Sequence, residues 1–152
     1  MKLARRSKDE EELLKLSVEL RLLEQTAETL QQRIGMLNAA ITDLTYASMT
    51  LEGVELEKEN SEILVPIGGS SYVKMKLANP DKVIIGLGAG VSVEKPLPEA
   101  KSMLKERQSE LEKTLLSAQQ QFTQVADRVN ADRNRLESLL GAAREGKASS
   151  NV

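Results

Sequence analysis

Two heptad patterns flank a short segment of different period, and this arrangement restricts the fold more than any other feature of the chain. In residues 1–53 and again in residues 99–145, apolar side chains return alternately every three and four positions, and no proline interrupts either run. This spacing is typical of coiled-coil helices. The first run has two registers: Leu13, Leu20, Ala27, Ile34, Ile41 and Ser48, and Leu16, Leu23, Leu30, Leu37, Leu44 and Leu51.

The second heptad run contains two polar residues on its seam, Asp132 and Gln108. We interpret both as residues that set the helix register, with Arg128 as the ion-pair partner of Asp132 one turn earlier. The alternative for Asp132 is that this end of the coiled coil opens locally. The registers of this run are Leu104, Leu111, Ala118, Val125, Asp132 and Leu139, and Gln108, Leu115, Phe122, Val129, Leu136 and Ala143.

The middle segment changes to the period of a β-strand. Residues 72–77 alternate strictly, which predicts a half-buried strand with Val73, Met75 and Leu77 on one face. Pro66 cannot donate a hydrogen bond to a sheet, so its strand is expected to be at an edge or bulged. Turn residues separate four expected strands and pair them as two successive hairpins; the strands are residues 62–67, 72–77, 82–87 and 91–94.

The expected fold is α+β: a long antiparallel two-helix coiled coil joined by two β-hairpins. Pairing residues whose numbers sum to about 152 places Leu13 opposite Leu139 and Leu16 opposite Leu136. Exposed strand edges invite pairing with other chains, so the hairpins are expected to form an oligomerisation body. The expected divisions are an N-terminal helix (1–53), the hairpins (54–98), a C-terminal helix (99–145) and a flexible tail (146–152).

Composition argues against an enzyme. The chain has neither cysteine nor histidine, which removes triads, thiol nucleophiles and the commonest metal ligands. We expect no metal and no cofactor. The 21 basic and 23 acidic residues give no basic excess for a nucleic-acid partner. No apolar run is long enough to span a membrane, so we expect no membrane partner and a cytoplasmic location.

Gly86-Leu87-Gly88-Ala89-Gly90 invites comparison with a dinucleotide-binding loop. That loop needs a further glycine where Val91 stands, and a helix must follow it. A strand is expected there instead. The motif is therefore interpreted as a hairpin turn that needs positive φ angles.

Basic residues near the end of the second heptad run leave a further alternative, an RNA-binding helical arm. They are Arg128, Arg133, Arg135 and Arg144. Acidic residues are interleaved with them, and no aromatic side chain accompanies them for base stacking.

The paired helix ends are the candidate binding site. Leu14 and Leu140 lie off the strict seam, so a two-helix coiled coil should leave them partly exposed. Exposed apolar surface at a tip often marks a binding site, although scattered exposed leucines are also common. The candidate tip residues are Leu13, Leu14, Leu16, Leu136, Leu139 and Leu140.

The middle segment contains four distinctive motifs: Ile63-Leu64-Val65-Pro66-Ile67-Gly68, Ser71-Tyr72-Val73, Asp81-Lys82-Val83-Ile84-Ile85 and Gly88-Ala89-Gly90-Val91-Ser92-Val93-Glu94-Lys95. Together they resemble the alpha class of prefoldin, a family of chaperone subunits. These match a "VP-G" strand, a "V-K" strand, a "KV-V" strand and a "G-GV-VEK" closing strand. The beta class has one hairpin, so two hairpins favour the alpha class.

The resemblance implies an ATP-independent holdase. Two alpha and four beta subunits would assemble through their hairpins, bind unfolded proteins at the coiled-coil tips and pass them to a group II chaperonin. The tip leucines would contact clients. The assembly residues would be Ile63, Val65, Ile67, Val73, Met75, Val83, Ile85, Val91 and Val93. The alternative is a structural subunit whose β interfaces close head-to-tail into a filament.

Overall fold

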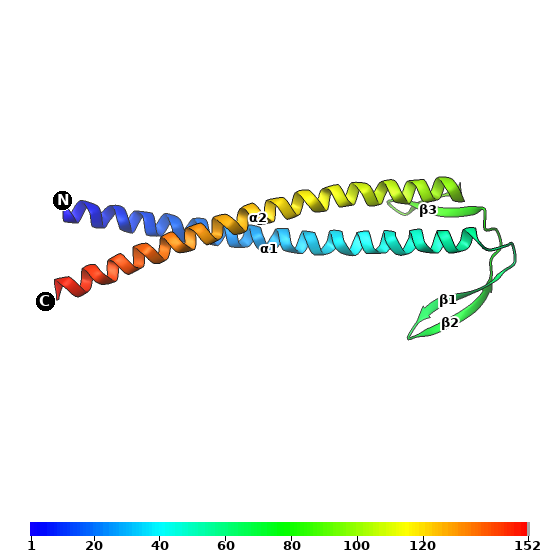
Figure 1. Ribbon diagram of the computed structural model, residues 1–152, viewed down its shortest axis with the longest axis horizontal. Helices are drawn as coiled ribbons and strands as arrows, with labels where there is room; N and C mark the ends of the chain where they lie inside the picture. Colours follow the sequence, from blue (N-terminus) through cyan, green and yellow to red (C-terminus); the bar gives the residue numbers. More distant parts are fainter. Residues whose placement is uncertain (152) are drawn as a thin grey trace. The chain divides into compact units, whose positions relative to one another are not determined.

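The computed structural model describes residues 1–151 and confirms the expected order of helix, two hairpins and helix (Figure 1). The elements are α1 (Lys2–Glu55), β1 (Glu62–Gly68), β2 (Ser71–Lys76), β3 (Lys82–Gly88), β4 (Val91–Pro96) and α2 (Leu97–Ser150). The chain divides into two units, which we describe separately. The arm unit comprises residues 1–37 and 114–152, and the hairpin unit comprises residues 38–113.

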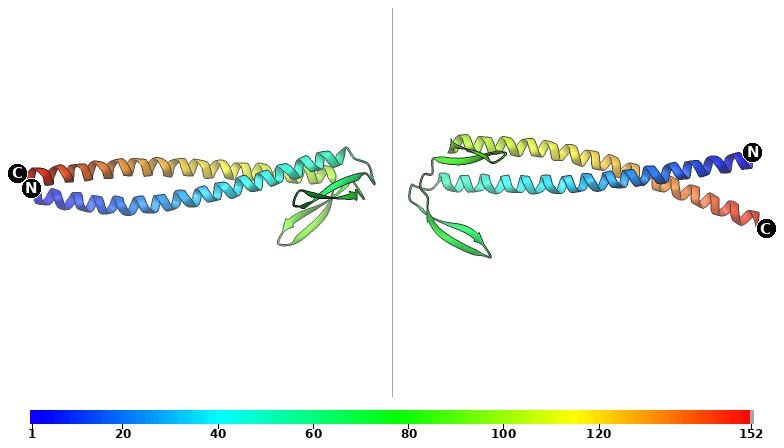
Figure 2. Two further views of the ribbon diagram at one scale, coloured as in Figure 1. Left: turned by 90° about the horizontal axis from the view of Figure 1, so that it is seen from below. Right: turned by 180° about the vertical axis from the view of Figure 1, so that it is seen from behind.

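The arm unit is a pair of antiparallel helices, the N-terminal part of α1 and the C-terminal part of α2. The start of α1 and the end of α2 lie at the same end of this unit in both views of Figure 2. Its most buried apolar residues come from the predicted seam: Leu30, Ala118, Val129 and Leu139, each at most 8% exposed. Each large apolar side chain buried in this way contributes about 1.5–3 kcal/mol, so the seam accounts for the pairing of the helices.

Helix α1 ends later than the sequence predicted. The expected end is residue 53, but Gly53 lies within the helix and its φ is not positive, so it is not a left-handed glycine cap. The last turn tightens instead: the N–H of Leu56 donates to the carbonyl of Gly53 at 3.2 Å, and that of Glu57 to Val54 at 3.0 Å. These bonds use carbonyls that a helix end leaves unpaired, so no glycine cap is needed.

Helix α2 also continues past its predicted end at residue 145. It runs to Ser150, so residues 146–150 of the expected tail are helical, while residue 152 lies outside the described residues. The hydroxyls of Ser149 and Ser150 donate to the carbonyls of Gly146 and Lys147 at 3.3 and 3.1 Å. Lys147 adds a positive charge in the last turn, where the helix dipole favours it.

The hairpin unit contains two separate two-stranded antiparallel sheets, β1–β2 and β3–β4. The second hairpin repeats the first with a shift of twenty positions: Glu62 pairs with Lys76, and Lys82 pairs with Pro96. Both hairpins turn through two residues with positive φ, and both have an irregularity just before the turn. The two hairpins are therefore the same structural motif used twice.

The bulge that Pro66 predicted is present, since the β1–β2 register shifts between Pro66 and Gly68. Proline is not its cause, because the same shift occurs in β3 between Gly86 and Gly88. What the two strands share is the glycine next to the turn: Gly68 and Gly88 have φ values of 100° and 101°. Those values favour glycine at both positions.

One hairpin packs on the helices of the hairpin unit. Ile85 of β3 contributes to a buried cluster with Leu51 of α1 and with Ala100 and Leu104 of α2. Ala100 is fully buried, and its small side chain lets the hairpin approach closely. At the same end Lys101 donates to Glu55 at 2.6 Å, and this hydrogen bond raises the pKa of Lys101.

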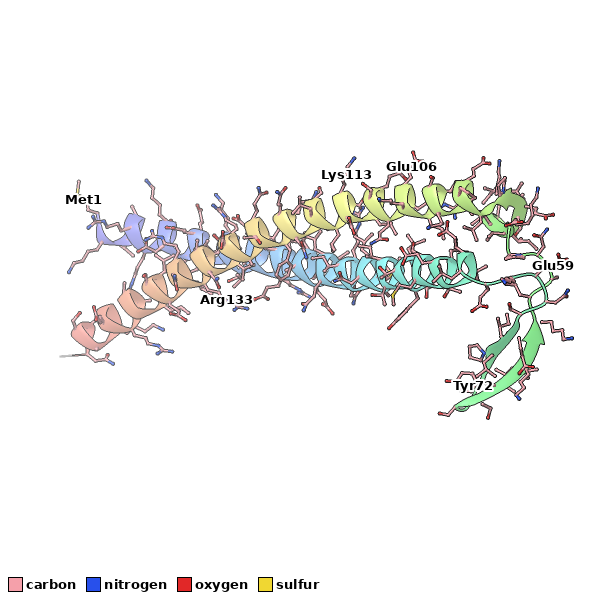
Figure 3. All side chains as sticks on the ribbon, turned by 45° about the vertical axis from the view of Figure 1, so that its right-hand side comes forward. Met1, Glu59, Tyr72, Glu106, Lys113 and Arg133 are labelled. Atoms are coloured by element: carbon pink, nitrogen blue, oxygen red, sulfur yellow. The ribbon has the colours of Figure 1, made fainter. Side chains whose placement is uncertain are left out.

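Hairpin β1–β2 is much more exposed than β3–β4. All six residues of β2 are exposed, including Val73 at 38% and Met75 at 47%; Tyr72, labelled in Figure 3, is 61% exposed. The predicted half-burial of β2 is therefore wrong for this chain alone. A strand is half-buried only where a second layer covers one face, and no described residue of the chain covers this face.

Candidate functional site

The six tip leucines do not form one surface. Leu139 is only 8% exposed, and Leu13, Leu16 and Leu136 are partly buried, as the seam predicts. Leu14 and Leu140 are 68% and 43% exposed. The structure therefore separates a seam set, which holds the helices together, from two outward leucines that are open to a partner.

Leu14 belongs to an exposed apolar row that the sequence analysis missed. Val18 and Leu22 follow it at intervals of four residues along α1 and are 54% and 59% exposed. We call these three residues the lateral row. A coiled coil normally has polar residues at such positions away from the seam, and this departure is the sequence signal that could have revealed the row.

The lateral row forms one wall of a shallow groove on α1. Lys15, Glu19, Leu23 and Thr26 complete its lining. The groove lies wholly within the arm unit.

Three ion pairs join the helices of the arm unit. Glu12 pairs with Arg135 at 2.8 Å and Glu24 with Arg133 at 2.6 Å; Arg128 pairs with a third glutamate of α1. The hydrogen bond from Arg135 lowers the pKa of Glu12, and the same bond raises the pKa of Arg135. Each pair joins residues adjacent to the seam, so the ion pairs agree with an antiparallel pairing in the predicted register.

The same pairs bear on the RNA alternative. Arg128, Arg133 and Arg135 each face a glutamate of α1. Three of the four arginines behind that alternative are thus engaged within the chain, and their charges are largely balanced at short range. The arrangement favours a role in helix pairing over a phosphate-binding stripe.

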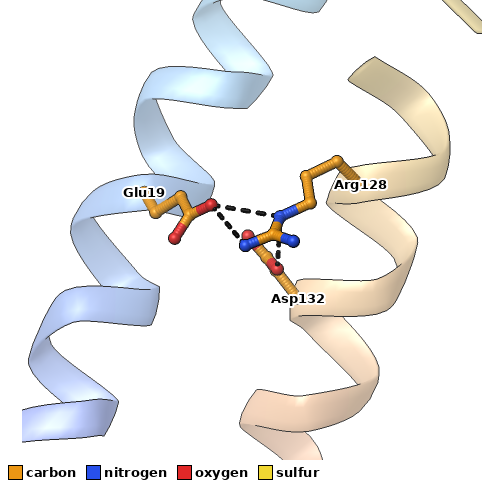
Figure 4. Close-up of polar contacts among 3 residues, drawn as sticks. All are labelled: Glu19, Arg128 and Asp132. Atoms are coloured by element: carbon orange, nitrogen blue, oxygen red, sulfur yellow. Dashed lines mark hydrogen bonds and ion pairs between the residues drawn. The ribbon is translucent and has the colours of Figure 1, made fainter. Parts of the chain in front are cut away.

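Asp132 is buried on the seam and paired with Arg128, as the sequence predicted (Figure 4). Its Oδ1 atom lies 3.2 Å from Nε of Arg128, whose Nη2 also lies 2.8 Å from Oε1 of Glu19. Among the described residues, Oδ2 of Asp132 has no hydrogen-bond partner. A buried carboxylate with one unpaired oxygen weakens the seam at this layer. The free-energy cost of removing the carboxylate from water exceeds the stabilisation that a single ion pair provides.

The candidate assembly residues lie on the two hairpins and differ in solvent exposure. Ile63, Val65, Val83 and Val93 are partly buried, whereas Ile67, Val73, Met75 and Val91 are exposed by 38–63%. Ile85 is the exception at 4% exposed, since it packs inside the chain's own cluster. In this structure Ile85 is a core residue. It can affect assembly only indirectly, by fixing where hairpin β3–β4 lies on the helices.

The first hairpin brings four of these residues onto one face. Ile63 pairs with Met75 and Val65 pairs with Val73, and side chains of directly paired residues lie on the same side of a sheet. Leu64 pairs with Lys74 on the opposite side. The hairpin thus presents an apolar face and a mixed face.

The glycine motif is a hairpin turn, as expected. It ends β3 and is followed directly by β4, and Gly88, Ala89 and Gly90 have φ values of 101°, 50° and 76°. No helix N-terminus meets it, so the arrangement that holds a dinucleotide phosphate is missing from this loop.

The described residues offer neither a membrane span nor a cluster of metal ligands. Neither helix of residues 1–151 is apolar enough over a sufficient length to cross a membrane. Within the same residues, no group of three acidic side chains is placed to hold a metal ion.

Outward-facing polar side chains cover much of the helices elsewhere. In Figure 3 the side chains of Glu106 and Lys113 project from α2 on the side away from α1. Such a surface is typical of a solvated helix face. The exposed lateral row and the apolar face of β1–β2 therefore stand out as the surfaces best suited to a partner.

Comparison with known proteins supports one family. A family model described as "Prefoldin subunit" matches residues 23–141. Proteins named prefoldin subunit alpha are similar over most of the chain. That of Methanococcoides burtonii is 32% identical, covering 87% of this chain and 93% of its own. The Methanosarcina barkeri protein is 38% identical, with 70% and 76% covered.

A solved structure is also similar. It is the cryo-EM structure of filamentous PFD from Methanocaldococcus jannaschii, with a TM-score of 0.65 and 26% sequence identity. The match covers 76% of this chain and 95% of that one.

Proposed function

Because this chain belongs to the prefoldin family of chaperone subunits, we propose that it is an alpha-class subunit of an ATP-independent holdase. In this proposal two alpha and four beta subunits assemble through their hairpins in the cytoplasm. The arm units hold unfolded clients at their tips and release them to a group II chaperonin. No cofactor takes part.

The observation that carries the proposal is the pair of outward leucines at the arm tip, Leu14 and Leu140. Unfolded proteins expose apolar side chains and have no fixed shape. A small apolar contact on each of several arms gives avidity without a shaped pocket, and it tolerates many client sequences. Seam residues such as Leu139 support this contact by holding the helices together.

Assembly is assigned to the apolar face of hairpin β1–β2. Its valine and methionine side chains are open in the single chain, and its strands have free edges. A second layer from another subunit would cover both, which is the usual way a protein protects an exposed sheet. We expect Val73→Asp with Met75→Asp to prevent assembly, and Leu64→Asp on the opposite face to leave the assembled mass unchanged.

The test of the holdase proposal uses the complex assembled with its partner subunits. Leu14→Ser with Leu140→Ser should weaken the suppression of client aggregation, measured by light scattering, while native mass spectrometry shows an unchanged complex. Leu116→Ser is the matched control, since Leu116 is 57% exposed on the same arm unit but lies outside the tip set. Full protection by the double variant would refute the assignment of the tip.

One observation favours a second candidate, a structural filament. The solved structure reported above is a filamentous assembly, and hairpin faces of the same kind can close head-to-tail. Native mass spectrometry of the complex from the source cells separates the two. Four copies of a smaller coiled-coil partner support the hexamer, whereas a polymer of this chain alone supports the filament.

A further inference from the structure

We propose that the lateral row of α1 is a docking groove for amphipathic helical segments of client proteins, with acidic residues beside their apolar ridge. The inference rests on the proposed holdase function and adds to it the conformation and charge of the bound segment. It places the contact on the side of one helix, beginning at Leu14 and continuing through Val18 and Leu22.

The groove has the form that accepts another helix. Leu14, Val18 and Leu22 form one ridge of residues four apart, which Thr26 extends, and Lys15, Glu19 and Leu23 form the parallel ridge. Helices pack by inserting such a ridge of one into the groove between two ridges of the other. Leu14, Val18 and Leu22 span about 80° of the helix surface, which is narrow enough for one partner helix.

The backbone of α1 decides between a helical and an extended client. Residues 14–26 lie in the interior of a long helix, so their backbone donors and acceptors are used within α1. An extended segment pressed against this apolar face would shield its own N–H and C=O groups from water without finding partners. A helical segment satisfies its backbone internally, so it can bury its apolar ridge here without that cost.

The charges that line the groove favour an acidic client. Glu19 is engaged within the chain by Arg128 at 2.8 Å, a guanidinium that it shares with Asp132. Lys15 forms no ion pair with any residue of the described chain. A client helix with glutamate or aspartate beside its apolar ridge would form an ion pair with Lys15. A client helix with lysine or arginine there would be repelled by the positive charge of Lys15.

The test measures peptide binding to the assembled complex by fluorescence anisotropy. The probe is a labelled peptide of about 16 residues with leucines at intervals of four and glutamates beside them. One comparison peptide has a central proline that prevents the helix, and another has lysines in place of the glutamates. We expect the probe to bind roughly tenfold more tightly than either.

Variants locate the contact. Val18→Ser with Leu22→Ser should weaken probe binding roughly tenfold, and Leu116→Ser should leave it unchanged. Lys15→Glu should reverse the preference between the glutamate and lysine peptides. Equal binding of the proline peptide, or unaltered binding to the serine variant, would overturn the proposal. A changed assembled mass in that variant would also overturn it, because the row would then be a subunit contact.

A parallel measurement separates this inference from the function on which it rests. If the wild-type complex suppresses client aggregation but shows no preference among the peptides, the helical groove is wrong and the holdase proposal stands. If the wild-type complex neither suppresses aggregation nor binds the probe, both proposals fall.

Discussion

The Nε atom of Arg128 lies 3.2 Å from Oδ1 of Asp132, one turn further along α2, and the carboxylate it faces is only 4% exposed. The same guanidinium also reaches Glu19 across the helix pair, and these carboxylates raise the pKa of Arg128. One cation therefore links a buried seam charge to the opposite helix. The arrangement stabilises one antiparallel alignment at the expense of apolar burial in that layer.

Replacing the buried charge tests this balance. Asp132→Leu should raise the free energy of unfolding by about 1–3 kcal/mol, because an apolar side chain fills the seam without needing a partner. Arg128→Met should act in the opposite direction, since it leaves Asp132 buried and unpaired. Glu19→Gln should have a smaller effect than Arg128→Met, because Glu19 is not on the seam. Urea unfolding followed by circular dichroism measures all three, and a destabilised Asp132→Leu would contradict this account.

The pair of Glu12 and Arg135 predicts a dependence of stability on pH. The hydrogen bond from Arg135 lowers the folded-state pKa of Glu12 below its ordinary value of 4.5. The pair therefore stabilises the folded chain fully above that value, and this contribution is lost as the pH falls through the folded-state pKa. Wild type should have a higher melting temperature than Glu12→Gln at pH 7, and the difference should shrink as the pH is lowered below 4.5.

The matched control for that series is Glu10→Gln. Glu10 is exposed and forms no ion pair within residues 1–151, so its replacement should shift the melting temperature less. Because the Glu12 pair is itself exposed, salt should reduce its effect. A difference between wild type and Glu12→Gln that does not shrink at all as the pH is lowered below 4.5 would exclude the ion pair as its origin.

The helices and hairpins could be predicted from the sequence because their periods differ over long runs. The seam that begins at Leu13 and the partner of Asp132 follow from the heptad, since spacing along a helix determines which side chains are neighbours. Helix ends were less predictable. The expected helix ends are residues 53 and 145, yet α1 continues to Glu55 and α2 to Ser150.

Neither the exposed lateral row nor the difference in burial between the two hairpins follows from the periods of the sequence. A heptad repeat specifies only the seam positions, so it does not predict that Val18 and Leu22, which lie off the seam, form an apolar row. Ile85 and its equivalent Val65 have the same place in the same hairpin motif. Only the contact with Leu51, Ala100 and Leu104 makes Ile85 a core residue, and that contact is tertiary.

Two adjacent isoleucines of β3 test that core. Ile85→Ala should lower the free energy of unfolding by about 2–4 kcal/mol, because it leaves a cavity in the buried cluster. Ile84→Ala is the matched control; Ile84 is 75% exposed, and the change should alter stability by no more than about 0.5 kcal/mol. Urea unfolding of the two variants measures the difference. Equal effects would mean that β3 does not pack on the helices as described.

Two glycines with equal free space should respond oppositely to alanine. A Cβ atom added at Gly35 or at Gly88 would meet nothing within 4 Å, so neither change is limited by sterics with neighbours. Gly35 lies inside α1 without a positive φ, and Gly35→Ala should stabilise the chain by about 0.5–1 kcal/mol, because alanine favours the helix. Gly88 has a φ of 101°, so Gly88→Ala should destabilise the hairpin by about 1 kcal/mol or more through backbone strain. Thermal unfolding measures both signs, and stabilisation by Gly88→Ala would show that the turn relaxes to a different conformation.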